Sequence, residues 1–186
     1  PVRAKLRVLC RDTQVLPHQH DWAQLAVSTT GTLHLRVPHA TFVVPPGRAL
    51  WIPPRVEHTV TLVETAELRT LYIYQAPGQC GPADGGSAQA IWQHCRVLEV
   101  SELMRALACD LSTTADDAAP PTAADTAQSV RERHVSALLL DELRRATQLH
   151  LRVDMPRDKR LQHLCSAVLQ DPVAHASLQA FAHNSG

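Results

Sequence analysis

Short β-rich runs separated by proline and glycine fill the first hundred residues, and they constrain the fold more than any other feature of this sequence. Runs such as QLAVST, TLHLRV, HTVTLV and ELRTLYIY recur along this part of the chain. Spacings of about 8 to 12 residues with turn residues between the runs are typical of β-sandwiches and barrels. The sequence therefore predicts an all-β barrel or sandwich over residues 1–100.

Helical patterns replace the short runs after Val100. Ser101 is an expected N-cap for a helix in LMRALACDL. Residues 112–126 contain few large apolar side chains and two adjacent prolines, so we expect a flexible connection there. Residues 129–151 carry apolar side chains three and four apart, which predicts a long amphipathic helix. A helix over residues 157–170 and a short one from Ser177 are expected to follow.

The composition argues against several classes of protein. The chain has 18 Lys and Arg against 18 Asp and Glu, so no global field attracts nucleic acid or an anionic membrane. Its five cysteines include no C-x-x-C pair, which argues against a disulfide framework and a thiolate zinc site and fits a reducing cytoplasm. No apolar run approaches the roughly 20 residues of a membrane span, and no signal-peptide pattern is present. We expect a cytoplasmic protein that does not enter a membrane.

A cluster of histidines stands out in the stretch LPHQHDWAQ. Side chains alternate faces on a β-strand, so His18, His20, Trp22 and Gln24 are expected to point the same way, into the barrel. His58 follows a Pro53-Pro54 bend and opens a later strand. Three histidines with one oxygen donor suit a divalent first-row ion such as Zn, Ni, Mn or Fe. The alternative is that these histidines are hydrogen-bonded lining of a pocket.

Aromatic residues are few, so each one that faces a cavity would form a large part of any ligand surface. Trp22 and Trp51 are candidates for that surface, although large aromatic residues in a small barrel also serve as core. Tyr72 and Tyr74 share a strand face, and one of their hydroxyl groups is expected to reach the pocket. The candidate ligand-binding residues are Trp22, Gln24, Trp51 and Tyr72.

The histidine segments resemble the two cupin motifs. The first is His18-x-His20, Gln24 and Gly31, with Gln24 where many cupins have glutamate. The second runs from Gly47 through Pro53-x-Arg55-x-x-His58, with Arg55 in place of a glycine. The resemblance implies a double-stranded β-helix with these residues at the metal-ligand positions: His18, His20, Gln24 and His58. Because a neutral amide is a poorer ligand for a dication than a carboxylate, Gln24 favours an effector pocket over a metal centre.

The order of parts along the chain resembles the AraC/XylS family of transcription regulators. The supporting stretches are the two cupin-like motifs, CRVLEVSELMRAL, and MPRDKRLQHLCSAVLQDPVAHASLQAFAHNSG. This resemblance implies a cupin-type effector-binding barrel over residues 1–100, a helical dimerisation region over residues 101–152, and the truncated start of a helix-turn-helix DNA-binding domain over residues 153–186. It also implies a non-enzymatic homodimer that binds a small-molecule effector, and binds DNA only in the full-length protein.

The long helix is expected to contribute to that dimer. Its apolar face can pack on its own barrel or against the matching helix of a second subunit, and we favour the second subunit. The face consists of Val135, Leu138, Leu139, Leu143 and Ala146.

Two other functions compete with the regulator. A metal-dependent cupin enzyme, such as an oxygenase or isomerase, would use the metal to polarise a substrate or activate water or oxygen. A dimerisation scaffold would have a barrel filled by its own side chains and would bind no effector.

Overall fold

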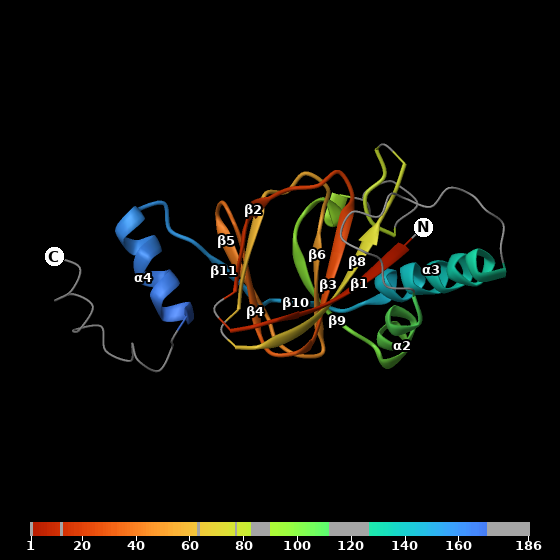
Figure 1. Ribbon diagram of the computed structural model, residues 1–186. Coiled ribbons are helices and arrows are strands. Elements are labelled where there is room, and N and C mark those ends of the chain that lie inside the picture. The colour runs from red at the N-terminus through yellow and green to blue at the C-terminus, as the bar shows by residue number, and fades with distance from the viewer. Residues whose placement is uncertain are drawn as a thin grey trace.

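Two antiparallel β-sheets face each other in the computed structural model, and helices lie outside them (Figure 1). The structure describes residues 2–11, 13–62, 64–76, 78–82, 90–111 and 127–170. The strands are β1 (Val2–Leu9), β2 (Gln14–His18), β3 (Ala23–Thr30), β4 (Leu33–Val37), β5 (Ala40–Val44), β6 (Arg48–Ile52), β7 (His58–Leu62), β8 (Ala66–Ile73), β9 (Arg96–Glu99), β10 (Gln148–Leu149) and β11 (Arg152–Asp154). The helices are the 3₁₀ turn η1 (Ile91–Gln93), α2 (Glu102–Asp110), α3 (Ala127–Arg145) and α4 (Lys159–Gln170).

The strand order identifies the topology. The six-stranded sheet runs β1-β8-β3-β6-β9-β10 and the five-stranded sheet runs β11-β5-β4-β7-β2. Strands β1 to β8 therefore switch sheets at every connection except the β4–β5 hairpin, which is the jelly-roll arrangement of cupins. The predicted mainly β barrel followed by helices is confirmed.

Apolar side chains form two separate layers, one on each side of the six-stranded sheet. The first fills the space between the sheets and includes Leu35, Phe42 and Ile52. The second covers the outer face of the six-stranded sheet and is shared with η1, α2 and α3. Strand β3 is buried on both faces as a result. Leu25 contributes to the outer layer, whereas its neighbour Gln24 faces the interior.

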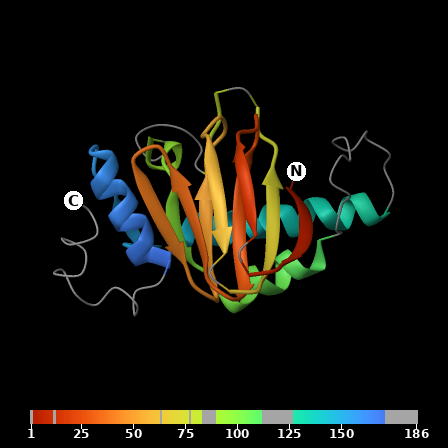
Figure 2. The same cartoon turned by 60° about the vertical axis from the view of Figure 1, so that its left-hand side comes forward.

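The helical layer is held by specific polar contacts. The Ser101 hydroxyl accepts a hydrogen bond of 2.9 Å from the Met104 amide, so the expected N-cap of α2 is confirmed. Arg131 in α3 forms an ion pair of 2.8 Å with Asp110 at the end of α2. Figure 2 shows both helices on the side of the barrel opposite to α4.

The apolar face of α3 packs on its own barrel, which corrects the expectation of a second subunit there. Leu139 and Leu143 are fully buried, and Val135 is 8% exposed, all within the layer on the six-stranded sheet. Ala146 packs against the same layer. The reason is that the outer face of this sheet is itself apolar and lies alongside the helix. Leu138 alone of the expected set is exposed, at 53%.

The end of α3 also differs from the expectation. The helix stops at Arg145 rather than continuing to Leu151. The chain then adds β10 to the edge of the six-stranded sheet and β11 to the edge of the five-stranded sheet. The expected boundary between the helical region and the DNA-binding part, between residues 152 and 153, falls inside β11. The barrel therefore includes strands that precede the helices in the sequence and strands that follow them.

Helix α4 lies outside the five-stranded sheet (Figures 1 and 2). The Asp158 carboxylate caps its start by accepting a hydrogen bond of 2.8 Å from the Arg160 amide. The helix expected over residues 157–170 is thus confirmed, whereas the connection at 112–126 and the helix from Ser177 fall outside the described residues. Within the described ranges, no helix is long and apolar enough to cross a membrane.

Candidate ligand and metal site in the barrel

The histidine segment bridges the two sheets. Strand β2 ends at His18 in the five-stranded sheet, a bend follows, and β3 begins at Ala23 in the six-stranded sheet. The expectation that His18, His20 and Gln24 share one continuous strand is therefore wrong. The residues still converge, because the chain crosses from one sheet to the other at this end of the barrel.

Three histidines meet at this crossing. His18 pairs with His58 of β7 just after an irregularity in the β2–β7 register, and their ring centroids are 4.3 Å apart. The His20 ring centroid lies 5.3 Å from that of His58 and 6.0 Å from that of His18. One ring nitrogen from each histidine lies within 4.8 Å of the others. His58 is 1% exposed whereas His18 is exposed, so the cluster runs from the interior to the surface.

Backbone carbonyl groups orient the three imidazole rings. Nδ1 lies 2.9 Å from the Leu16 oxygen in His18, 2.8 Å from the Trp22 oxygen in His20, and 2.8 Å from the Val56 oxygen in His58. A neutral imidazole that donates from Nδ1 keeps a lone pair on Nε2. His58 Nε2 is buried and has no hydrogen-bond partner among the residues that the structure describes. The cluster therefore presents an unmatched acceptor to the interior.

Gln24 lies beside the cluster and interacts with His20. Its Oε1 is 2.7 Å from His20 Nε2. The two orientations of a carboxamide differ only in which atom is labelled oxygen and which nitrogen. With neutral His20, the Gln24 amide group donates to Nε2; with protonated His20, Nε2 donates to Oε1. In either case Gln24 competes with a metal ion for His20.

Burial keeps His58 uncharged at neutral pH. Desolvation lowers the pKa of His58 from 6.5 to about 4, and repulsion from His18 and His20 acts in the same direction, against the Val56 carbonyl group, which raises it. Neutral imidazole is the form that binds metal ions and accepts hydrogen bonds. The three histidine nitrogens thus fit a divalent ion, and Gln24 could add its oxygen only by giving up its contact with His20.

An aromatic wall adjoins the histidines. The Trp22 ring stacks on His20 with centroids 5.3 Å apart and planes 4° apart. Tyr74 lies 5.4 Å and Tyr72 6.0 Å from the Trp22 ring. Trp22 Nε1 is buried without a hydrogen-bond partner in the described part of the chain. Burial raises the pKa of Tyr72, and the Arg7 guanidinium opposes that rise.

Trp51 does not belong to this wall, which corrects its assignment as a ligand-binding residue. It is fully buried in the outer apolar layer, and its Nε1 donates a hydrogen bond of 2.8 Å to the Trp92 oxygen. Its neighbours Leu50 and Ile52 face the interior, so alternation turns Trp51 toward the helices.

Basic residues of β1 were missed by the sequence reasoning. Val2 and Ala4 face the helical layer, so Arg3, Lys5 and Arg7 point to the inner side of the sheet. The sequence signal was the basic residue at every second position of VRAKLRVL, from Arg3 to Arg7. The hydrophobic residues at the end of the strand make this alternation harder to recognise.

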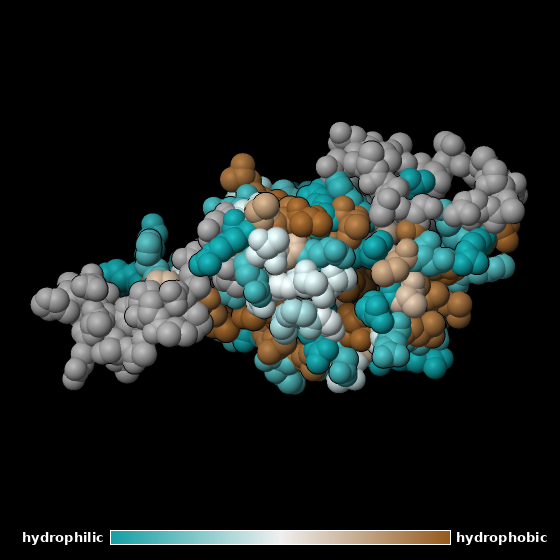
Figure 3. Space-filling view, turned by 60° about the horizontal axis from the view of Figure 1, so that its bottom comes forward, coloured by the Kyte–Doolittle hydropathy of each residue, from teal (hydrophilic) through white to brown (hydrophobic). Residues whose placement is uncertain are grey.

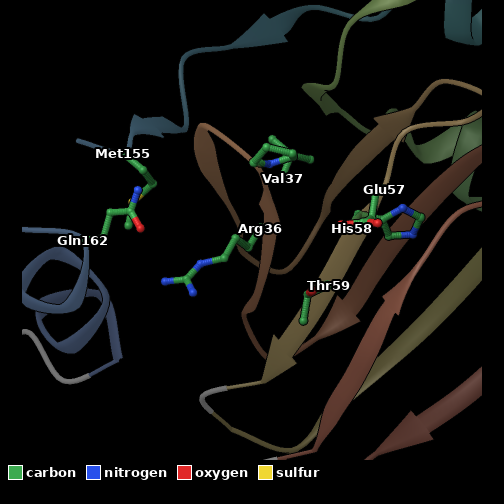
Figure 4. A pocket seen from close by; sticks show the side chains of 8 residues that line it. Arg36, Val37, Glu57, His58, Thr59, Met155 and Gln162 are labelled. Atoms are coloured by element: carbon green, nitrogen blue, oxygen red, sulfur yellow. The ribbon is translucent and has the colours of Figure 1, made fainter. Parts of the chain in front are cut away.

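Two grooves lie between the five-stranded sheet and α4. The smaller, of about 240 Å³, is lined by residues that include Arg36, Met155 and Gln162 and reaches His58 (Figure 4). The larger, of about 780 Å³, is lined by polar residues such as His34, Thr61 and His163. Both open on the outer face of this sheet, away from the aromatic wall.

Comparison with known proteins places the chain in a family. The sequence profile described as the AraC-like ligand binding domain matches residues 11–143. The HTH-type transcriptional regulator NimR of Escherichia coli (strain K12) is 29% identical over 167 residues, which cover 89% of this chain and 54% of NimR. The chain thus spans about half the length of this relative.

Solved structures of low similarity include cupins. An RmlC-like cupin from Shewanella frigidimarina NCIMB 400 is 18% identical with a TM-score of 0.37, covering 41% of this chain and 68% of that one. KdgF from Halomonas sp. is 19% identical with a TM-score of 0.38, covering 40% and 71%. The family assignment comes from the profile, which matches most of the chain. The chain belongs to the AraC-like ligand binding domain family.

Proposed function

We propose that this chain is the effector-sensing part of an AraC-type transcription regulator, and that a small molecule binds beside His20, Gln24, Trp22 and Tyr72. One observation carries the proposal: two buried polar atoms, His58 Nε2 and Trp22 Nε1, have no partner in the described chain and lie on the same cluster. Buried polar atoms without partners are rare in folded proteins, and a ligand is one way to satisfy them.

The six-stranded sheet provides a route from the ligand to the helices. Gln24 and Leu25 are adjacent in β3 and face the barrel interior and the helical layer respectively. Leu139 of α3 packs in that same layer. A ligand that binds one arrangement of β3 better than another will therefore bias α3 as well.

The chain continues from α3 toward the expected DNA-binding part. After β10 and β11 it enters α4, which we propose is the first helix of a helix-turn-helix domain completed in the full-length protein. In that motif the helix after the turn reads the major groove. We propose this domain order: an effector-binding barrel built mainly from residues 1–100, a helical region after it, and the start of the DNA-binding domain from about residue 155.

Dimerisation is proposed through the outer surface of the helical pair. Leu138, Leu103 and Val130 are exposed at 53%, 50% and 37%. These side chains point away from the barrel, which covers only the inner face of α3, so they are available for contact with a second subunit. Figure 3 shows one face of the molecule on which hydrophobic residues form separate patches among hydrophilic ones. Leu138→Glu is expected to lower the sedimentation coefficient toward that of a monomer, whereas Leu161→Glu, at a position of α4 that is 50% exposed, serves as the control.

Metal binding is the second candidate, and the grouping of the histidine nitrogens within 4.8 Å supports it. His18, His20 and His58 would hold the ion, with Gln24 as the oxygen donor. A divalent ion there would act as a Lewis acid on a bound ligand or substrate. Gln24 adds no negative charge, and no acidic side chain faces inward from β1, β3 or β8 to act as a general base. These features favour sensing over a metal-dependent oxygenase or isomerase.

A ligand screen tests the proposed function. The purified chain is heated with a library of small metabolites, with and without EDTA or added Zn²⁺, Ni²⁺, Mn²⁺ or Fe²⁺. A ligand at 100 times its Kd is expected to raise stability by about 2.7 kcal/mol. The response should disappear in Trp22→Ala and persist in Trp92→Phe, whose ring lies in the outer layer. Stoichiometric metal with turnover of a substrate would instead establish the enzyme, and no response in any condition would support a scaffold.

A further inference from the structure

The outer face of the five-stranded sheet carries polar side chains where it faces α4. The pairing of β2, β7, β4 and β5 places two cross-strand rows of these side chains on that face. Paired residues of neighbouring strands point to the same side of a sheet, so each row is continuous. In one row Thr61 lies between Gln14 and His34, and in the other Arg36 lies between Thr59 and Thr41.

These six side chains form the floor of the larger groove, which has a volume of about 780 Å³. Helix α4 forms the opposite wall with residues that include Lys159, His163 and Ser166. Figure 2 shows α4 alongside this sheet. Sites for small molecules usually measure about 300–1,000 Å³. The groove is therefore large enough for a ligand that contacts both the barrel and the helix.

Two residues of the floor are buried although they lie on the outer face of the sheet. Thr41 is 4% exposed, and its hydroxyl group has no hydrogen-bond partner within the described chain. His34 is 9% exposed, and burial lowers its pKa, so its ring is neutral at pH 7. A buried hydroxyl group without a partner is unusual in a folded protein. It indicates that water or a ligand supplies the missing hydrogen bond.

Two cations line the groove, and neither is paired with an acid among the described residues. Arg36 extends from β4 toward α4 (Figure 4), where its Nη2 donates a hydrogen bond to the neutral hydroxyl group of Ser166. Lys159 lies at the start of α4 and forms no ion pair within the described ranges. No described residue that lines this groove is acidic, and Glu57 lines only the smaller groove. The larger groove therefore has a local positive charge.

The lining determines the kind of molecule that fits. Guanidinium and ammonium groups are common partners of phosphate groups, and a guanidinium can donate two parallel hydrogen bonds to one phosphate. The hydroxyl and amide groups of the floor can donate to, and accept from, the hydroxyl groups of a polar body. No Phe, Tyr or Trp is among the described lining residues, so a flat apolar body would gain little contact.

On these grounds we propose that this groove is a second ligand site, which takes a small phosphorylated sugar or polyol between the five-stranded sheet and α4. Arg36 and Lys159 bind the phosphate group, and Thr41 with its neighbours in the floor binds the hydroxyl groups of the body. Because the ligand contacts both walls, it holds α4 against the barrel. The groove is separate from the site at His20 and Trp22, so either proposal can fail without the other.

Matched pairs with and without a phosphate group test the inference. Calorimetry on the whole chain compares ribose 5-phosphate with ribose, glucose 6-phosphate with glucose, and glycerol 3-phosphate with glycerol at constant ionic strength. We expect at least one phosphorylated molecule to bind about tenfold or more tightly than its match, the size expected for one charge-assisted hydrogen bond. Inorganic phosphate, which lacks the body, should bind more weakly than that molecule.

Variants assign the preference to the groove. Arg36→Met and Lys159→Met should each weaken binding of the phosphorylated molecule, and the double variant should abolish the preference. Arg105→Met removes an exposed arginine of α2 that does not line the groove, and it should leave the preference unchanged. Thr41→Val keeps the shape of the side chain and removes the unpartnered hydroxyl group. It should weaken binding without lowering the melting temperature of the free chain, and circular dichroism checks that each variant is folded.

Hydrogen exchange locates the bound molecule. The amides of α4 should exchange more slowly in the complex, because the ligand holds this helix against the sheet. The amides of α2, on the other side of the barrel, should exchange at an unchanged rate. Trp22→Ala should retain the affinity, since Trp22 belongs to the other site.

Several outcomes would overturn the inference. Equal affinity within every pair, inorganic phosphate that binds as tightly as the phosphorylated molecules, or no binding by any of them would leave the groove to water. A preference that survives in the folded double variant, or that Arg105→Met reduces as much as Arg36→Met does, would place the phosphate elsewhere. Binding that Trp22→Ala abolishes, with no change in the exchange of α4, would place the ligand inside the barrel and would support the sensor alone.

Discussion

Leu138 and Leu139 are adjacent in α3 but lie in opposite environments, one 53% exposed and the other fully buried against the six-stranded sheet. Leu139→Ala should lower the free energy of unfolding by about 2–5 kcal/mol, because it leaves a cavity in the layer. Leu138→Ala should change it by less than about 0.5 kcal/mol. Urea denaturation followed by circular dichroism measures both. Equal effects of the two substitutions would contradict the packing of α3 on its own barrel.

The position of α3 illustrates what a sequence pattern can and cannot predict. Apolar residues three and four apart identify a helix and its hydrophobic face, and that part of the prediction is confirmed. The pattern does not say which surface covers the face. The apolar face of α3 could be covered either by a second subunit or by the outer side of the six-stranded sheet. In this structure the six-stranded sheet covers it.

Similar limits explain the errors among the strands. The run ALWI predicts a strand in which Trp51 opposes Leu50 and Ile52, but alternation alone does not say which face is interior. Strands β10 and β11 are too short to carry a periodic signal. The histidines converge as expected, although by a crossing between sheets that local sequence does not reveal.

Two glycines with the same backbone angle should respond differently to alanine. Gly31 and Gly47 both have a φ of +72°, so a side chain at either position adds backbone strain of about 1–2 kcal/mol. A Cβ at Gly31 would also lie 2.5 Å from the Thr65 oxygen, whereas a Cβ at Gly47 would meet nothing within 4 Å. Gly31→Ala should therefore reduce the melting temperature clearly more than Gly47→Ala. A larger effect at Gly47 would contradict the turn geometry.

Acid should destabilise the metal-free protein through His58. The pKa of His58 is lowered from 6.5 to about 4, so the unfolded chain binds a proton at pH values where the folded chain does not. The stability due to neutral His58 is complete above pH 6.5 and is lost as the pH falls toward about 4. The loss should reach about 3 kcal/mol at most.

Unfolding free energies measured in EDTA between pH 7 and pH 4 test this dependence on His58. His58→Gln should show a shallower fall over the same range, with His39→Gln, an exposed histidine, as the control. Parallel curves for the wild type and His58→Gln would show that other groups cause the acid effect.

Trp22 and Trp51 should separate ligand binding from folding. Trp51 packs at 5.2 Å from Trp92 in the outer layer, and its indole N–H donates to the Trp92 oxygen. Trp51→Phe should therefore lower the free energy of unfolding by about 1–3 kcal/mol, since the Trp92 carbonyl loses its indole donor and keeps only the weaker Cys80 thiol. Trp22 lies on the aromatic wall and its N–H has no partner in the described chain, so Trp22→Phe should cost less stability.

Ligand binding should show the opposite order. An effector found in the thermal screen should bind more weakly to Trp22→Phe, whereas folded Trp51→Phe should retain its affinity. Calorimetry at a temperature well below both melting points measures this without interference from unfolding. A loss of affinity in Trp51→Phe with none in Trp22→Phe would place the ligand on the helical side of the six-stranded sheet, and the pocket at His20 and Gln24 would then be the wrong site.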